Sequence, residues 1–170
     1  MRIISGTWRS RPLIAPKGDT TRPTADRTRE TLFSMLTSRL GSFEGLQVLD
    51  LFSGSGALGL EALSRGAAHC VFVEQDKAAL DALETNIAKL GAGPQSEIKR
   101  GSALMLGPAR KAYDLILLDP PYGTGAGVVA LDKLSRLGWV ASGALVSIET
   151  GNREDTVVKW LSAIERRRDR

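Results

Sequence analysis

The sequence predicts an α/β fold, a doubly wound and mostly parallel sheet with helices on both faces, preceded by a small N-terminal hairpin or arm. After Gly45, short apolar segments alternate with segments of helical periodicity, as in successive strand–helix–strand units. Residues 115–118 are apolar without interruption, which is typical of a parallel strand buried on both faces. A chain of 170 residues, 42% of them hydrophobic, can bury one core, so a single main domain is expected.

Each element is placed by its apolar spacing and its flanking residues. Strands are expected at 47–53, 69–75, 97–100, 113–119 and 144–149. Helices are expected at 24–40, 57–65, 77–90 and 128–137. Pro23 precedes the first helix and Gly41 follows it, so its two ends are marked.

Residues 1–23 differ in composition from the domain that follows, residues 24–170. They carry five cations and one acidic residue: Arg2, Arg9, Arg11, Lys17, Arg22 and Asp19. Short apolar pieces flank the turn signal Gly6-Thr7, which predicts a small hairpin. The segment is interpreted either as a flexible, solvated terminus or as a basic RNA-binding surface on which Trp8 stacks a base.

The charge and the cysteine count set the class of protein. A formal net charge of +4 suits a nucleic-acid partner without establishing one. Cys70 is the single cysteine, so an intrachain disulfide is excluded and a reducing compartment is expected. We expect Cys70 in the core and assign neither it nor His69 a catalytic role. No segment approaches the ~20 apolar residues of a membrane span, so we expect a cytoplasmic protein.

A glycine-rich turn joins the first expected strand to the next helix. Gly54 and Gly56 can adopt positive φ, and Gly59 allows helix and strand to pack closely. Such a turn serves a dinucleotide, another adenosine cofactor or only the chain reversal. Asp50 lies near the strand end, where we expect its carboxylate to point into the crevice above the sheet. Glu74, roughly 20 residues downstream, favours an adenosine ligand without a 2′-phosphate.

The segment Asp119-Pro120-Pro121-Tyr122 follows the most apolar expected strand. Ligands of open α/β sheets bind outside the carboxyl ends of the strands, which places Asp119 beside the glycine turn. The Asp119 carboxylate and the Pro120 carbonyl can each accept one N–H of a base amine and aim its lone pair at a methyl sulfonium. Tyr122 can stack on the base. In isolation, an Asp-Pro pair is also an ordinary turn start.

Four stretches carry a resemblance to a known family. They are 2–11, with Arg-Ile-Ile-Ser-Gly at its start; 22–33, with Arg-Pro-Thr-Ala-Asp-Arg; 49–67, from Leu-Asp-Leu-Phe to Leu-Ser-Arg-Gly-Ala; and 119–122. On these residues the chain resembles the class I S-adenosylmethionine-dependent methyltransferases, and within them the bacterial 16S rRNA guanine-N2 methyltransferases. The last stretch is shared with adenine-N6 enzymes, so the N-terminal stretches are the specific part. The resemblance implies a Rossmann-like fold with S-adenosyl-L-methionine as cofactor.

The resemblance also implies a role for individual residues, and no metal. The catalytic residues would be Asp119, Pro120, Pro121 and Tyr122. The cofactor would be bound from the strand ends by Asp50, Phe52, Ser53, Gly54, Ser55, Gly56, Glu74, Gln75, Asp76, Ser102 and Ala103, and from the first helix by Arg22, Thr24, Asp26, Arg29 and Glu30. RNA would be bound by Arg2, Trp8, Arg9, Arg11, Lys17 and Arg22.

The chain departs from the family pattern at two places. Related enzymes often place an acidic or amide residue after the third strand to contact the adenine amine, where this chain has Ser102, a weaker acceptor. The family closes its sheet with an antiparallel hairpin. Residues 164–170 could supply its first strand, but the sequence stops before a second. We therefore expect an exposed edge on the fifth strand and a missing C-terminal strand.

The expected activity is methyl transfer from S-adenosyl-L-methionine to the exocyclic N2 of a guanine in 16S rRNA, within the assembled 30S subunit and by a monomer. Two alternatives remain. One is adenine-N6 methylation of RNA or DNA, since the motif at 119–122 marks amino methylation without naming the base. The other is an RNA-binding assembly factor that has kept the fold without catalysis. It would bind RNA in a salt-sensitive manner, independently of the cofactor.

Overall fold

A six-stranded sheet forms the centre of the computed structural model, which describes residues 1–17, 22–121, 125–149 and 155–159, without the side chains of 22–25, 149 and 155–159. The strands are β1 (Gln47–Leu51), β2 (His69–Glu74), β3 (Ser96–Arg100), β4 (Tyr113–Leu118), β5 (Val140–Glu149) and β6 (Asp155–Lys159). Their order is β3-β2-β1-β4-β5-β6, with the first five parallel and β6 antiparallel to β5. The predicted doubly wound α/β fold is therefore confirmed.

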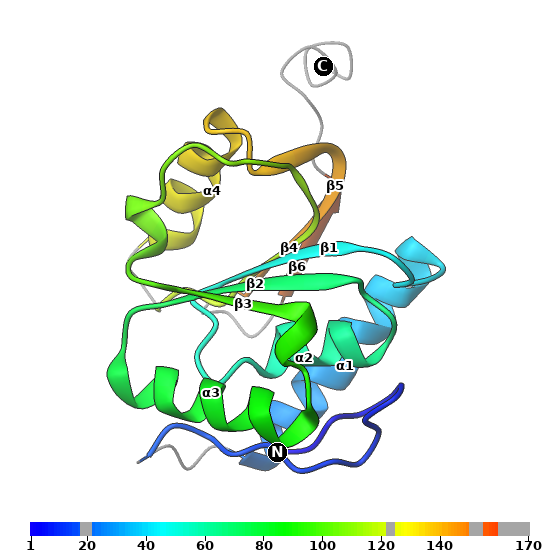
Figure 1. Ribbon diagram of the computed structural model, residues 1–170. Coiled ribbons are helices and arrows are strands. Elements are labelled where there is room, and N and C mark those ends of the chain that lie inside the picture. The colour runs from blue at the N-terminus through cyan, green and yellow to red at the C-terminus, as the bar shows by residue number, and fades with distance from the viewer. Residues whose placement is uncertain (18–21, 122–124, 150–154, 160–170) are drawn as a thin grey trace.

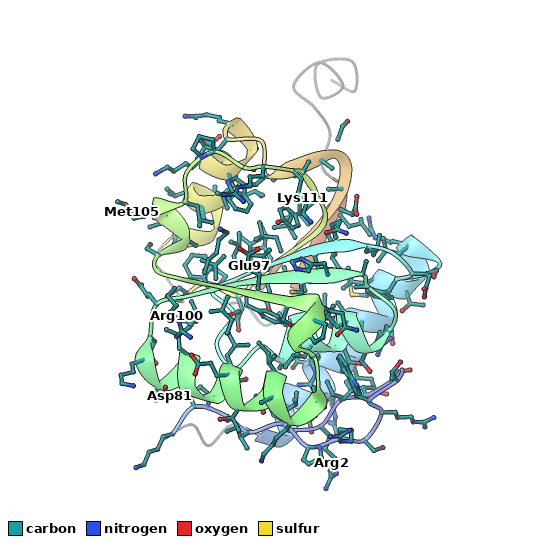
Figure 2. The ribbon with its side chains drawn as sticks, viewed as in Figure 1. Arg2, Asp81, Glu97, Arg100, Met105 and Lys111 are labelled. Carbon is teal, nitrogen blue, oxygen red and sulfur yellow. The ribbon has the colours of Figure 1, made fainter. Side chains whose placement is uncertain are left out.

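Helices cover both faces of this sheet. They are α1 (Arg22–Leu40), α2 (Ala57–Ser64), α3 (Lys77–Leu90) and α4 (Ala126–Arg136), with short 3₁₀ turns η1 (Gly93–Gln95) and η2 (Ala103–Met105). Figure 1 shows α4 on one face of the sheet and α1, α2 and α3 on the other. Figure 2 places Met105 on the α4 side and Arg2 on the opposite side, beyond α3.

The alternation of side chains along the strands divides the interior into two cores. Val48 and Leu115 pack with α1, α2 and α3, whereas Leu49 and Ile116 pack with α4. Successive residues of a strand point to opposite faces, so this alternation fixes the face of every other strand residue. Asp50 therefore shares the face of Val48 and lies under α2.

The end residues of α3 explain why its predicted bounds, 77–90, are confirmed. The Asp76 carboxylate accepts a hydrogen bond from the Ala79 backbone N–H at 3.0 Å and caps the first turn. Gly91 ends the helix in the left-handed conformation, with φ of 67°. Both signals are local, and they can therefore be recognised in the sequence.

The N-terminal residues form a hairpin rather than a free terminus. Arg2 and Pro12 form an antiparallel bridge, and backbone hydrogen bonds join Ile3 to Arg11 and Leu13 to Met1. Ile3 and Leu13 are buried in the core that contains α1, α2 and α3. The interpretation of this segment as a flexible terminus therefore does not hold for residues 1–17, which are called the arm below.

The outer edge of the sheet differs from the prediction. β5 begins at Val140, four residues before the expected start, because the strand continues through Gly143 with an irregular register against β4. The edge of β5 that we expected to be exposed pairs with β6, at Asp155–Lys159. The strand expected within 164–170 lies outside the described residues.

Two further expectations concern the described residues as a whole. Cys70 is fully buried in the core, as predicted. Among the described helices, none has the length and apolar character needed to cross a membrane.

Candidate active site

Three strand ends meet at one edge of the sheet. Leu51 of β1 is in register with Val73 of β2 and with Leu118 of β4. The residues that follow are also joined, since the Ser53 N–H donates to the Val73 carbonyl at 3.0 Å and the Asp119 N–H to the Leu51 carbonyl at 3.4 Å. The loops after β1, β2 and β4 are therefore neighbours, as the sequence predicts for an open α/β sheet.

The glycine loop, defined as residues 52–56, has an unusual backbone. Phe52, Gly54 and Gly56 all have positive φ, of 56°, 57° and 86°. Positive φ is rare for a bulky residue such as Phe52, so the surrounding structure must hold it there. A Cβ on Gly56 would lie 2.4 Å from Leu83, whereas a Cβ on Gly54 would meet no atom within 4 Å. The loop is thus packed on its helix side and open at Gly54.

The Glu74 carboxylate organises this loop. Its Oε1 accepts a hydrogen bond from the Gly54 N–H at 2.8 Å. Its Oε2 accepts from the N–H groups of Gln75 and Asp76 at 2.9 and 2.8 Å. A carboxylate has about four acceptor positions, so these three bonds leave capacity for a ligand. The ribose contact that the sequence suggests for Glu74 stays a prediction.

Asp50 does not lie where the sequence analysis placed it. Its side chain is 1% exposed, and its Oδ2 accepts a hydrogen bond from the Gly59 N–H at 2.9 Å. Burial raises the pKa of the Asp50 carboxyl well above its usual value; the Gly59 bond opposes the rise and the Glu74 charge adds to it. The expectation that this carboxylate points into the crevice is wrong, because even-numbered residues of β1 face α2.

Gly59 has the close-packing role expected of it. A Cβ there would lie 2.4 Å from the Phe72 ring, 2.7 Å from the Cys70 sulfur and 3.0 Å from Asp50 Oδ2. Only glycine allows α2 to approach β1 and β2 this closely. The same approach brings the Gly59 N–H to Asp50, so the helix start and the strand end are fixed together.

The segment after β4 lies at the same edge of the sheet. Asp119 is exposed and Pro120 is half-buried. Pro120 packs against the start of α4, where a Cβ on Gly127 would lie 2.8 Å from its ring. Pro121 is exposed, and Tyr122 lies outside the described residues. The structure therefore brings Asp119 and Pro120 to the glycine loop and supports them from α4.

The residues expected around an adenine surround the ends of β2 and β3. Gln75 and Asp76 are exposed, although Asp76 also caps α3. The Ser102 hydroxyl accepts a hydrogen bond from the Leu104 N–H at 3.1 Å and so caps η2. Ala103 is buried. Ser102 thus has a structural partner beside any ligand contact.

The side chain of Ser53 is the part of the glycine loop that most clearly indicates a ligand. Its hydroxyl oxygen is buried, and within the described part of the chain it has no hydrogen-bond partner. A buried polar group without a partner costs about 1–3 kcal/mol, so native structures rarely leave one unpaired. Together with the open side of Gly54 and the carboxylate of Glu74, this hydroxyl fits a polar ligand of the adenosine class.

The start of α1 contacts the arm through Arg29. Arg29 is 3% exposed, and its guanidinium donates to the backbone carbonyl of Arg2 and to Asp26 Oδ1. These contacts tie α1 to the arm. Glu30 is exposed, and the side chains of Arg22 and Thr24 lie outside the described residues. A cofactor contact from this helix stays a prediction.

A buried carboxylate that the sequence analysis missed fixes the arm to α2. Glu61 is 0% exposed, and its oxygens accept hydrogen bonds from the N–H groups of Ile4 and Ser5 at 2.9 and 3.1 Å. The cations of Arg65 and Arg29 flank it at 2.9 and 3.6 Å. The available signal is that Glu61 is the only charged residue of α2.

A second buried polar residue of α2 continues this interface. The Ser64 hydroxyl accepts a hydrogen bond from the Trp8 N–H at 3.0 Å and donates to the Ser5 carbonyl at 2.7 Å. Gly6 is so close that a Cβ would lie 1.9 Å from the Ser64 carbonyl oxygen. The arm is therefore seated directly on α2.

The arm presents basic side chains outward. Four of the predicted RNA-binding cations lie on it and are exposed: Arg2, Arg9, Arg11 and Lys17. Trp8 is half-buried and packs against the core, so only part of its ring is accessible. Arg11 also donates to the Lys89 carbonyl of α3 at 2.7 Å. The cations thus sit on a fixed surface.

Comparison with known proteins gives consistent results. The family model described as Conserved hypothetical protein 95 matches residues 1–170. The Ribosomal RNA small subunit methyltransferase D of Escherichia coli K12 is 39% identical over 150 residues, 88% of this chain and 74% of that protein. The protein of the same name from Haemophilus influenzae is 37% identical over 154 residues, 88% of this chain and 78% of that protein.

A solved structure also resembles this chain in fold and sequence. That of the Escherichia coli protein yhhF has a TM-score of 0.77 and 40% sequence identity, and it covers 88% of this chain and 80% of that one. The sheet order and the three converging strand ends are thus those of a class I methyltransferase. The chain belongs to the family of the ribosomal RNA small subunit methyltransferase D proteins.

Proposed function

We propose that the protein transfers a methyl group from S-adenosyl-L-methionine to the exocyclic N2 of a guanine in 16S rRNA, acting as a cytoplasmic monomer on the assembled 30S subunit. The observation that carries the proposal is the meeting of the glycine loop, Glu74 and Asp119 at one sheet edge. A cofactor on the first two and a base amine on the third would lie side by side. The relatives named for the small ribosomal subunit support the choice of RNA.

The Asp119-Pro120 pair suits the activation of a base amine. The lone pair of an exocyclic nitrogen is delocalised into the ring, so the nitrogen is a weak nucleophile. The Asp119 carboxylate and the Pro120 carbonyl would accept its two N–H groups and direct the lone pair at the methyl carbon. As the N–C bond forms, the bond between the methyl carbon and the sulfonium sulfur would break and release S-adenosylhomocysteine, and Asp119 would take the proton that leaves the nitrogen. Packing of Pro120 on Gly127 holds the carbonyl in place.

The glycine loop suits S-adenosyl-L-methionine, which supplies an electrophilic methyl group on a sulfonium. The Ser53 hydroxyl, which has no partner within the described residues, would form a hydrogen bond with the methionine end of the cofactor. The open side of Gly54 would let the cofactor approach the backbone of the loop closely. The Glu74 carboxylate would accept hydrogen bonds from the ribose hydroxyls. Gln75, Asp76 and Ser102 would border the adenine.

The arm would contact the RNA backbone. Its exposed cations neutralise phosphates, and its fixed position gives these contacts a defined geometry. A domain of this size has little surface for reading a sequence, so we expect recognition of RNA shape with the target base turned out of its stack. Ribosomal proteins bound nearby would then form part of the recognised surface.

The test is methyl transfer from labelled S-adenosyl-L-methionine to 30S particles and to naked 16S rRNA, both from cells that lack this activity. The methylated nucleoside is then identified by mass spectrometry. Label in N2-methylguanosine, with particles preferred over naked RNA, is the expected result. Label in N6-methyladenosine would instead identify an adenine enzyme. Cofactor-independent RNA binding without any label would favour an assembly factor and contradict the proposal.

A further inference from the structure

Asn86 joins the arm to the glycine loop through three hydrogen bonds. This residue of α3 is 0% exposed. Its Oδ1 accepts from the Ile14 N–H at 2.9 Å, and its Nδ2 donates to the Ile14 carbonyl at 2.9 Å and to the Ser55 carbonyl at 3.0 Å. Ile14 belongs to the arm and Ser55 to the glycine loop. One side chain therefore contacts the two segments for which RNA binding and cofactor binding are proposed.

The chemistry of this position selects asparagine. A side-chain amide has two N–H donors and one carbonyl acceptor, and here both donors and the acceptor are in use. Aspartate has the same shape but would set a carboxylate against the two carbonyls. Serine and alanine would leave the backbone groups of Ile14 and the buried carbonyl of Ser55 without this partner, which is costly. The three bonds also fix the orientation of the amide, since a flipped amide would oppose Oδ1 to both carbonyls.

The elements around Asn86 connect the arm to the glycine loop. α3 lies between the arm and the sheet (Figure 1), and its start follows the end of β2, where Glu74 bonds the Gly54 N–H. Ser55 lies between Gly54 and Gly56, both in the left-handed conformation. On the side of α3 the loop packs closely, since a Cβ on Gly56 would lie 2.4 Å from Leu83. A shift of the Ser55 carbonyl would therefore move the open part of the loop at Gly54.

We propose that Asn86 is a positioning residue that couples the arm to the glycine loop, so that RNA bound on the arm strengthens cofactor binding and cofactor strengthens RNA binding. The inference rests on the proposed function, because it takes the arm as the RNA surface and the loop as the cofactor site. Coupling between two binding equilibria is reciprocal, so each ligand changes the affinity of the other by the same factor.

The experiment measures the dissociation constant of S-adenosylhomocysteine by calorimetry, with and without 30S particles, for the wild type, Asn86→Asp and Asn86→Ala. Ser64→Ala is the matched control, because the Ser64 hydroxyl also holds the arm, through hydrogen bonds to Trp8 and Ser5 and not to the glycine loop. We expect particles to tighten wild-type binding by about fivefold or more. Both Asn86 variants should bind about tenfold more weakly and lose the effect of particles.

The control separates coupling from simple destabilisation. Ser64→Ala should lower the melting temperature in a similar way but keep the wild-type affinity for S-adenosylhomocysteine within about twofold. In turnover, the Asn86 variants should raise KM for S-adenosyl-L-methionine more than they lower kcat.

Two results with the variants would overturn the inference: wild-type affinity in folded Asn86 variants, or equal losses in Ser64→Ala and Asn86→Ala. A wild-type protein that binds S-adenosylhomocysteine but shows no effect of particles would also overturn the coupling. A wild-type protein that fails to bind S-adenosylhomocysteine would instead contradict the proposed function itself. A failure of the coupling is thus distinguishable from a failure of the proposed function.

Discussion

The arm interface and the strand-end site differ in how the protein compensates a buried carboxylate. At the arm interface, Glu61 accepts two backbone hydrogen bonds and is flanked by two guanidinium groups. At the strand ends, Asp50 accepts one bond, from Gly59, among the interactions found in the described residues, and the buried Ser53 hydroxyl has no partner there. The protein itself compensates the charge of Glu61, although the buried Nε of Arg29 beside it has no hydrogen-bond partner within the described residues. For the strand-end site, we propose that a ligand supplies the remaining contacts.

This difference shows how to tell a structural polar group from a functional one. A buried charge is tolerated when opposite charges and donors compensate its lost hydration, as around Glu61. A buried group that lacks such compensation needs another reason to be retained, and ligand binding is the usual one. The predictions below follow from this contrast.

The largest effect is expected at Asp119. Asp119→Ala removes the carboxylate that would accept the amine proton, and turnover should fall by about 100- to 10,000-fold. Binding of S-adenosylhomocysteine should stay within about threefold, because Asp119 is proposed to act on the base and not on the cofactor. Labelled methyl transfer and calorimetry measure the two effects. Equal losses of turnover and cofactor binding would contradict this division of the site.

Glu61 should have the next largest effect, on stability. Glu61→Ala removes the acceptor of two arm N–H groups and of Arg65, and it takes away one of the carboxylates beside the buried Arg29 cation. It should lower the free energy of unfolding by about 3–5 kcal/mol. Chemical denaturation measures this loss. Glu61→Gln is the control, since it keeps one acceptor oxygen and should cost less. A cost of Glu61→Ala below about 1 kcal/mol would show that the arm interface does not depend on this carboxylate.

Asp50, the buried carboxyl of the strand-end site, should make the free energy of unfolding depend on pH. Burial raises its pKa in the folded state above the usual value of 3.8, so the native protein holds this proton more tightly than the unfolded chain. The free energy of unfolding should then fall as pH rises from about 4 towards the folded pKa. Asp50→Asn should remove that decline and, without cofactor, stabilise the protein at neutral pH. Denaturation curves at several pH values test this, and an unchanged decline in Asp50→Asn would assign it to another group.

The smallest effect is expected at Ser102. Its hydroxyl caps η2, so Ser102→Ala should lower the free energy of unfolding by about 0.5–1 kcal/mol. If the hydroxyl also borders the adenine, affinity for S-adenosylhomocysteine should fall by about twofold to fivefold. Calorimetry and thermal denaturation separate the two roles. An unchanged affinity together with a lower melting temperature would leave only the capping role.

Most of the fold was predictable because its signals are local. Apolar runs placed the central strands, and apolar spacing placed α3 correctly to the residue. In the structure, the Asp76 cap and Gly91 mark the two ends of that helix. β6 was missed because Asp155–Lys159 is short and lacks a clear alternation of apolar and polar residues. Its pairing with β5 depends on contacts across the sheet edge, which a single sequence does not display.

The site was only partly predictable for the same reason. The glycines and Glu74 have a recognisable spacing, and the structure places them together. Asp50 was misplaced because the side of β1 on which it lies depends on which face α2 covers. Asn86 was missed because its partners, Ile14 and Ser55, are 72 and 31 residues away in the sequence.

The most direct test of the contrast between the two regions is a crystal structure of the protein with S-adenosylhomocysteine. The account predicts the ligand at the glycine loop, with the Ser53 hydroxyl and the Glu74 carboxylate at about 3 Å from its polar atoms. The contacts of Glu61 with Ile4 and Ser5 should be unchanged. A ligand bound elsewhere, or a Ser53 hydroxyl still without a partner beside the bound ligand, would contradict it.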